Sequence, residues 1–226
     1  MKHTAKNPSG RAIFAEAKRA ARRKDYRAAL ALFQRAASQG EVEAHDWLGS
    51  AYDYGLGTKP SPRRAFKHYS LAAQAGSPSG QYNLALCYYL GLGTGKDYKS
   101  AVRLLRGALG RKDPEAAHLL ARCYRYGHGI QRDIRKGFLL ELQAAEESVV
   151  EAQFSVGTCY SRGEGVGADL SEALKWYLRA AKRGHDDAAH NVGYFYETGR
   201  GVEANKRKAA AWYRRAKRLA SMRAVH

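Results

Sequence analysis

Residues 152–184 read AQFSVGTCYSRGEGVGADLSEALKWYLRAAKRG, with two helical patterns on either side of a glycine-containing loop. In the first half, Ala152, Val156 and Tyr160 stand four residues apart, which places them on one face of a helix. In the second half, small and aromatic residues recur at helical spacing, at positions 173, 176, 177, 180 and 181. Gly163 and Gly165 lie between the halves and can take positive φ at low steric cost. The stretch therefore predicts two helices joined by a tight loop.

The same pattern returns along the chain with a constant period of 36 residues. One tyrosine and two glycines keep their places in five successive copies. The tyrosines are Tyr52, Tyr88, Tyr124, Tyr160 and Tyr196, and the glycine columns are Gly55, Gly91, Gly127, Gly163, Gly199 and Gly57, Gly93, Gly129, Gly165, Gly201. A fixed period of this length is typical of solenoids, whose units bury their apolar faces only by stacking. The predicted fold is an all-α, right-handed α-solenoid of stacked antiparallel helix pairs.

Residues suited to helix ends recur in the same register. Side chains that can cap a helix N-terminus precede every expected second helix: Asp25, Ser61, Asp97, Asp133, Asp169 and Asn205. Glycines stand where three second helices should end: Gly40, Gly76 and Gly184.

Small residues also form a column, which reads Gly49, Ala85, Ala121, Gly157 and Gly193. Glycine inside a helix costs up to about 1 kcal/mol relative to alanine. Its recurrence predicts close helix–helix approach, with a tyrosine or tryptophan of the neighbouring helix filling the space.

These columns together resemble the Sel1-like repeat family, which is related to the tetratricopeptide repeats. The family pattern A-x3-LG-x2-Y-x2-G-x-GV-x2-D-x3-A-x2-WY-x2-AA-x2-G is matched almost fully from Ala152 to Gly184, and closely from Ala188 to Ala216. The resemblance covers roughly residues 25–220. It implies a protein–protein interaction scaffold or adaptor, since members commonly act in signalling, membrane-associated complexes and bacterial host interaction.

One continuous repeat region is expected over residues 25–220. A basic segment with a capping helix precedes it (1–24), and a basic tail follows it (221–226). An isolated second helix occupies 25–40, and five helix pairs start near residues 41, 77, 113, 149 and 185. The capping helix spans about 10–22, with Glu16 at the tyrosine position. The second helix at about 133–147 has Gly137 for alanine and Leu140-Glu141 for the aromatic pair, so we expect it to be bent or shifted.

The three cysteines, Cys87, Cys123 and Cys159, are also one period apart. Equivalent positions in such a stack lie roughly 10 Å apart, the spacing of packed helices, whereas a disulfide needs Cα atoms within about 7 Å. We therefore expect three buried free thiols in a core column.

The net charge of +18 is concentrated at the two ends. Residues 1–27 hold nine Lys/Arg and two acidic residues, and residues 203–226 hold eight and one. Basic caps and a solvated face explain this distribution, and so does a patch for an acidic protein, nucleic acid or anionic membrane. No apolar run approaches the roughly 20 residues of a membrane span, and residues 1–8 lack the apolar core of a secretory signal. A cytoplasmic location is expected.

In tetratricopeptide-like stacks the first helices line the concave face. By that analogy, the groove columns vary between repeats and mix aromatic with charged residues, the composition favoured at binding hot spots. The candidate partner-binding residues are Tyr82, Leu86, Tyr89, His118, Arg122, Arg125, Tyr126, Phe154, Arg162 and Tyr194. The arginines could hold a carboxylate or phosphate, and the rings supply rigid contact area.

The sequence contains no nucleophile elbow, zinc-protease motif or paired-cysteine motif. Residues 92–97 superficially resemble a phosphate loop, but Leu90 stands where its first glycine should be and Asp97 replaces the Ser/Thr. His118 and Cys123 are five residues apart and point about 140° apart on a helix, which disfavours a shared metal. No cofactor, metal site or enzymatic activity is expected. For an enzyme, His118 with Arg122 and Arg125 is the cluster to inspect.

The expected function is a scaffold or adaptor that binds a segment of another protein along its concave groove. Two alternatives stay open. One is binding of nucleic acid or an acidic surface through the basic ends and second helices, and the other is a secreted or translocated host-interaction effector.

Overall fold

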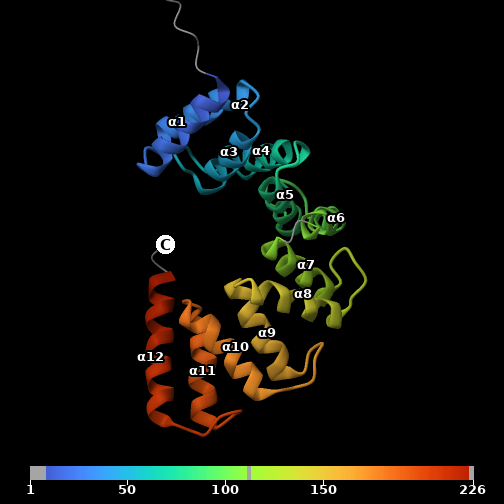
Figure 1. The fold of residues 1–226 in the computed structure, drawn as a ribbon, viewed down its shortest axis with the longest axis vertical. Helices are drawn as coiled ribbons and strands as arrows, with labels where there is room; N and C mark the ends of the chain where they lie inside the picture. The colour runs from blue at the N-terminus through green and yellow to red at the C-terminus, as the bar shows by residue number, and fades with distance from the viewer. Residues whose placement is uncertain (1–8, 111–112, 224–226) are drawn as a thin grey trace, which may run out of the picture. The chain divides into compact units, whose positions relative to one another are not determined.

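The computed structural model describes residues 9–110 and 113–223, which form twelve α-helices and no strand (Figure 1). The described helices divide into two compact units, with the division between residues 111 and 112. The helices of the first unit are α1 (Gly10–Arg22), α2 (Tyr26–Ser38), α3 (Glu43–Tyr54), α4 (Pro62–Gln74), α5 (Pro78–Leu90) and α6 (Tyr98–Leu109). Those of the second are α7 (Pro114–Tyr126), α8 (Ile134–Glu146), α9 (Val150–Arg162), α10 (Leu170–Lys182), α11 (Asp186–Thr198) and α12 (Lys206–Arg223).

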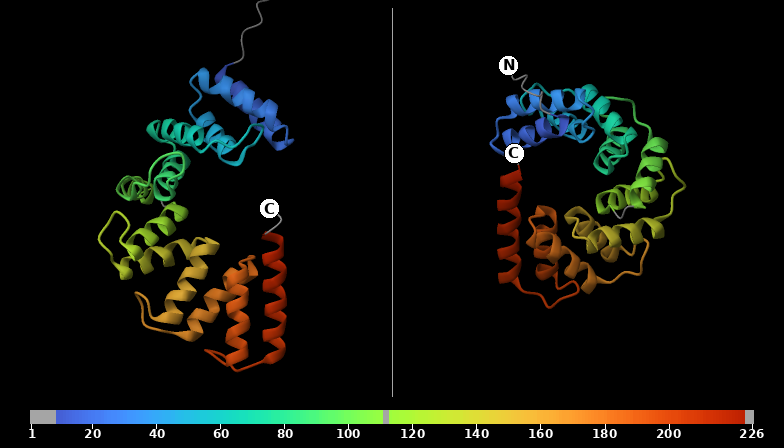
Figure 2. Two further views of the ribbon diagram at one scale, coloured as in Figure 1. Left: turned by 180° about the vertical axis from the view of Figure 1, so that it is seen from behind. Right: turned by 45° about the horizontal axis from the view of Figure 1, so that its top comes forward.

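Within each unit, every helix packs on the helix before it and the helix after it. Figure 2 shows this arrangement for α11 and α12, which run side by side. The prediction of an all-α fold of stacked helix pairs is confirmed, and the pairs begin within two residues of the expected positions. The expectation that one repeat region continues through both units stays a prediction. Residues 1–8 and 224–226 of the expected terminal segments lie outside the described residues, and α12 continues to Arg223.

The repeated tyrosine and the first repeated glycine together turn the chain between paired helices. After α9, Gly163 adopts φ of 72° and its N–H donates to the carbonyl of Cys159 at 2.8 Å. The carbonyl of Tyr160 then accepts the N–H of Asp169, the residue that precedes α10, at 2.9 Å. Equivalent hydrogen bonds are accepted by the carbonyls of Tyr52, Tyr88, Tyr124 and Tyr196. The end of each first helix is thereby tied to the start of its partner.

The second glycine of the loop contacts the preceding repeat. Gly165 has φ of 77°, and a Cβ placed there would lie 2.6 Å from the carbonyl oxygen of Ile134, in the first turn of α8. Gly201 meets the backbone of Leu170 in the same way. No side chain fits at these positions, because both the backbone conformation and the close approach exclude it.

The predicted N-caps are confirmed at five of six positions, where Asp25, Asp97, Asp133, Asp169 and Asn205 accept a backbone N–H three residues on. The expectation is wrong at Ser61, whose hydroxyl makes no cap hydrogen bond in the described structure. Pro62 occupies the first position of α4 and has no N–H, so this helix start has one donor fewer to satisfy.

The glycines inside first helices accommodate tyrosine rings, as the sequence predicts. A Cβ on Gly157 would lie 2.7 Å from the ring of Tyr177, and one on Gly193 would lie 2.8 Å from the ring of Tyr213. Gly49 lies even closer to the ring of Tyr69. The three cysteines are buried and free, as expected.

The second helix of the third repeat was expected to be bent or shifted, but α8 is an uninterrupted α-helix with Asp133 as its cap. Gly137 lets this helix approach α7, since a Cβ there would lie 3.0 Å from the carbonyl oxygen of Ala121. Glu141 takes the place that Tyr177 holds one repeat later, and it is paired with His118. The departures from the pattern are therefore compensated locally.

Each of the two terminal helices has an exposed outer side, while the capping role expected for the helix at 10–22 stays a prediction. In α1, Ile13, Phe14, Ala17 and Ala20 are buried, and the rest of the helix is mostly exposed. In α8 and α10, the side of the second helix that meets the next repeat is apolar, whereas in the last helix, α12, the same side is exposed and largely basic. Phe138 of α8 packs edge-on against Tyr160, and Leu174 of α10 is buried. In α12 the equivalent side carries Ala210, Arg214 and Lys217, all exposed.

Candidate ligand-binding groove

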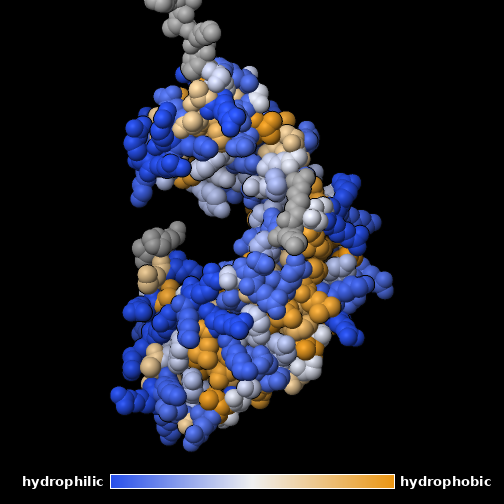
Figure 3. All heavy atoms as spheres, viewed as in Figure 1, coloured by the Kyte–Doolittle hydropathy of each residue, from blue (hydrophilic) through white to orange (hydrophobic). Residues whose placement is uncertain are grey.

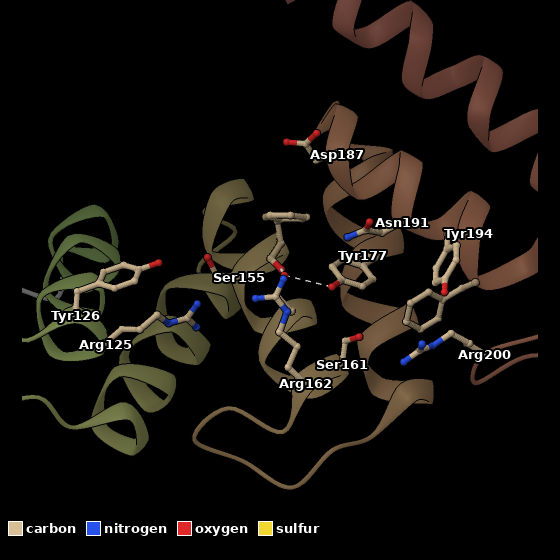
Figure 4. Close-up of a pocket in the computed structure, with 13 residues that line it drawn as sticks. Arg125, Tyr126, Ser155, Ser161, Arg162, Tyr177, Asp187, Asn191, Tyr194 and Arg200 are labelled. Atoms are coloured by element: carbon tan, nitrogen blue, oxygen red, sulfur yellow. Dashed lines mark hydrogen bonds between the residues drawn. The ribbon is translucent and has the colours of Figure 1, made fainter. Parts of the chain in front are cut away.

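A groove of about 710 Å³ lies in the second unit, along its first helices (Figure 4). Helices α7, α9 and α11 supply most of its lining, and α10 adds Tyr177. One further side chain, Arg200, comes from the loop after α11. The lining residues are Arg125, Tyr126, Phe154, Ser155, Thr158, Ser161, Arg162, Tyr177, Asp187, Asn191, Tyr194, Phe195 and Arg200.

Three arginines give the groove a positive side. Arg125 is largely buried, and its Nη2 lies 2.5 Å from Sγ of Cys159. Burial raises the pKa of Cys159 to about 11, so Arg125 faces a neutral thiol near pH 7. Arg200 lies over the rings of Tyr194 and Phe195, with its guanidinium carbon 5.9 and 6.0 Å from their centroids. Figure 4 shows Asp187, the single acidic residue of the lining, on the opposite side of the groove from Arg162 and Arg200.

One carboxylate, Glu164, stands between two of these arginines. Its Oε2 is 3.8 Å from Nη1 of Arg125, and its Oε1 is 3.7 Å from Nη1 of Arg162. Both separations exceed the range of a hydrogen bond. Glu164 therefore offsets some of the positive charge without occupying the guanidinium donors.

Aromatic and hydroxyl side chains form the remainder of the surface. Phe154 stacks on His185 with ring centroids 4.4 Å apart, which fixes its orientation. The hydroxyl of Tyr177 donates to Oγ1 of Thr158 at 3.2 Å. Tyr126 and Tyr194 are 57% and 41% exposed, so their rings offer apolar area to a ligand.

The structure brings five of the ten candidate groove residues into this lining: Arg125, Tyr126, Phe154, Arg162 and Tyr194. His118 and Arg122 belong to the same unit but not to the lining. Tyr82, Leu86 and Tyr89 belong to the first unit, where Tyr82 and Leu86 are half-buried. Tyr89 is only 5% exposed and packs edge-on against Tyr98, so its ring belongs to the core. Binding of one partner by all ten candidate residues together stays a prediction.

Arg200 and Tyr177 line the groove but are missing from the sequence-based candidates, for identifiable reasons. Arg200 lies between Gly199 and Gly201, in a loop where helical spacing gives no guidance. Tyr177 belongs to the packing column, yet its hydroxyl end reaches the groove. On α11, Asp187 holds a groove-column position, and the half-buried Asn191 lies one turn further along the helix.

In the cluster singled out for enzymatic chemistry, His118 has a buried partner outside the cluster. Nδ1 of His118 lies 2.7 Å from Oε2 of Glu141, which is 1% exposed. The contact joins His118 of α7 to Glu141 of α8, which stands at the position that Tyr177 and Tyr213 hold in later repeats. The contact gives both side chains a structural role, because each satisfies the polar atom of the other.

One group of potential metal ligands occurs among the described residues: His185, Asp186 and Asp187. Nδ1 of His185 accepts the N–H of Ala188 at 3.3 Å, and Asp186 pairs with Arg223 at 3.0 Å. These two side chains therefore have structural roles at the start of α11.

The repeat geometry agrees with a known family model. The model of the Sel1 repeat matches residues 20–41, 42–77, 78–108, 114–149, 150–185 and 186–221. The chain belongs to the Sel1 repeat family. Sel1 repeat proteins are generally protein-interaction scaffolds, and their fold is a non-enzymatic, protein-binding helical repeat.

Solved Sel1 repeat proteins resemble this one closely. A Sel1 repeat protein from Oxalobacter formigenes is 31% identical, with a TM-score of 0.83 over 91% of this chain and 84% of that chain. A protective antigen of uropathogenic Escherichia coli strains is 27% identical, with a TM-score of 0.82 over 93% of this chain and 46% of that chain. An immunity protein from Pseudomonas aeruginosa, 22% identical with a TM-score of 0.62 over 95% of this chain and 83% of that chain, shares the fold.

A curated relative matches only in part. An uncharacterized protein of Neisseria meningitidis serogroup B is 39% identical over 70 residues, which span 31% of this chain and 15% of that protein. Among the described helices of the present chain, none is both long and apolar enough to cross a membrane.

Proposed function

We propose that this Sel1 repeat protein is an adaptor that binds an extended segment of a partner protein in the groove of its second unit. The observation that supports the proposal is the convergence of Arg125, Arg162 and Arg200 with the exposed rings of Tyr126 and Tyr194. Rings of this kind supply rigid contact area, and arginine supplies directed donors, which is the composition of binding hot spots. Binding rather than catalysis is the proposed role, in keeping with the family.

The groove is held in shape before a partner arrives. Phe154 stacks on His185, Tyr177 is bonded to Thr158, and the loop after α9 is fixed by Gly163 and Gly165. A rigid surface loses little conformational entropy on binding, so more of the contact energy remains as affinity.

Affinity purification from the native host tests the proposal with three forms of the full chain. These are the wild type, Arg125→Ala/Arg162→Ala, and Arg135→Ala, which changes an exposed arginine of α8 outside the lining. Purification is repeated at low and high salt, with nuclease treatment. We expect a discrete protein partner that survives both treatments, remains with Arg135→Ala and is lost with the double variant. A partner that stays with the double variant excludes the groove.

A second candidate function rests on α12. This helix carries eight Lys/Arg and no acidic residue, and hydrophilic side chains cover much of it in the view of Figure 3. Binding of nucleic acid through such a surface would fall steeply with salt, because each phosphate contact releases counterions. Nucleic acid recovered at low salt and lost after nuclease treatment would favour this function.

A further inference from the structure

The relation between Glu164 and its two arginines indicates what the groove recognises. Glu164 lies between Gly163 and Gly165, so its backbone position is set by two residues with positive φ. Each carboxylate oxygen faces a different arginine, with Oε2 toward Arg125 and Oε1 toward Arg162. A single carboxylate already rests between two guanidinium groups that belong to different repeats.

The contacts of Glu164 with Arg125 and Arg162 are longer than the hydrogen bonds that arginine can form with a carboxylate. Carboxylates held by arginine usually accept N–H groups at about 2.7–2.9 Å, often two at once. Here the separations are 3.8 and 3.7 Å, and the side chain of Arg162 is 68% exposed. The guanidinium of Arg162 projects into the groove in Figure 4, where a ligand can approach it. An anion that enters from the groove can therefore form the direct hydrogen bonds that Glu164 does not.

The same loop position in the next repeat holds Arg200 instead of a carboxylate. Arg200 also lines the groove, over Tyr194 and Phe195. Glu164, in the loop after α9, thus offsets part of the positive charge at Arg125 and Arg162, whereas no carboxylate holds the equivalent position beside Arg200. Asp187 lies on the opposite side of the groove, so the surface has a positive side and a negative side (Figure 4).

We propose that the groove recognises a partner segment through a carboxylate side chain held between Arg125 and Arg162, and that Glu164 is a built-in competitor for this position. The proposal rests on the proposed function and adds the chemistry of the recognised group. The ligand carboxylate forms direct hydrogen bonds to Arg162 and displaces the weaker contacts of Glu164. The apolar residues of the segment lie on Tyr126 and Phe154.

Removal of the competitor gives the discriminating variant. Glu164→Gln keeps the size of the side chain and removes its charge, so no protein carboxylate competes with a ligand at the two arginines. An acidic ligand should then bind more tightly, whereas a scaffold that merely needed Glu164 for structure would bind more weakly. Arg162→Ala removes the exposed arginine and should act in the opposite direction. Arg135→Ala, at an exposed arginine of α8, is the matched control outside the lining.

The probe is an array of synthetic peptides of seven residues with varied flanks, in matched triplets that differ only at the centre. The central residue is glutamate, glutamine or phosphoserine, and binding of the purified full chain is measured by fluorescence. We expect glutamate peptides to exceed their glutamine partners about tenfold, the worth of a charge-assisted hydrogen bond. Glu164→Gln should raise glutamate binding about threefold or more, and Arg162→Ala should abolish the preference while Arg135→Ala keeps it.

The outcomes separate the two proposals. Peptides that bind through the groove with equal glutamate and glutamine signals, or a Glu164→Gln variant that binds glutamate peptides no better, would overturn the carboxylate proposal and leave the adaptor function standing. A strong excess of phosphoserine over glutamate would assign the site to phosphate and overturn the commitment to a carboxylate side chain. Absence of any peptide binding that is weakened by Arg162→Ala would contradict the peptide groove itself.

Discussion

The close fit of Gly157 to Tyr177 can be tested with one added methyl group. In the variant Gly157→Ala, the new Cβ would lie 2.7 Å from Cδ1 and 2.8 Å from Cε1 of Tyr177. Carbon atoms in favourable contact are about 3.5–4.0 Å apart, so the ring or the helix must shift by close to 1 Å. Overpacking of this kind costs about 1–3 kcal/mol, whereas the change from glycine to alanine in a helix returns up to about 1 kcal/mol. We expect a net loss of about 1–2 kcal/mol.

Gly107 provides a matched control. It also lies inside a helix, α6, but a Cβ there meets nothing within 4 Å. Gly107→Ala should therefore stabilise the protein by up to about 1 kcal/mol through helix propensity alone. A second comparison is Gly157→Ala/Tyr177→Leu, which reproduces the Ala85 and Leu105 combination of an earlier repeat. Coupling between the two substitutions should recover about 1–2 kcal/mol.

The assay combines urea unfolding with hydrogen exchange of the amides in α9 and α10. Exchange is needed because a stack of repeats can unfold in parts, which makes a single unfolding free energy ambiguous. Gly157→Ala should lower the protection of both helices, and the double variant should restore much of it. If Gly157→Ala instead gains stability as Gly107→Ala does, the argument for ring-in-gap packing is refuted.

Three further outcomes are expected. Gly165→Ala should lower stability by about 2 kcal/mol or more, measured by urea unfolding, since a positive φ and a backbone contact both oppose the side chain. Burial and the nearby His45 lower the pKa of His68 to about 4. Its contribution to stability is therefore complete above pH 6.5 and is lost as the pH falls toward 4, so His68→Leu should show a weaker loss of thermal stability over that range. Burial raises the pKa of each cysteine to about 11, so all three thiols should react with a disulfide reagent slowly in buffer and rapidly in urea.

Residues that repeat made the fold predictable from the sequence. The period, the loop glycines and the cap residues each specify a local geometry, and the structure confirms them at nearly every position. Gly157 and Tyr177 are twenty residues apart, and so are Ala121 and Glu141. The same size matching, of a small residue with the side chain that faces it, could therefore have been predicted for the second pair. Reading that relation would have shown that α8 needed no distortion.

The groove was only half predictable. Column positions identified Arg125 and Phe154, because helix spacing determines which side chains share a face. They could not place Arg200, whose position depends on loop geometry, nor show that Tyr89 turns inward against Tyr98. Such details depend on how one helix is rotated against the next, and this rotation is set by packing rather than by spacing along the chain.

Each helix glycine and the tyrosine ring that packs against it belong to the same helix pair. A complete helix pair therefore contains both members of this size-matched contact. Recombination at the short links between pairs, such as residues 183–185, would exchange units with this matching intact. A crossover in the loop within a pair would separate its members. Joining Ala121 to the helix that contains Tyr177 would create a clash, and joining Gly157 to the helix that contains Glu141 would leave a gap beside a buried polar side chain. Gene duplication and chimera construction should therefore succeed in steps of complete pairs, with junctions before first helices.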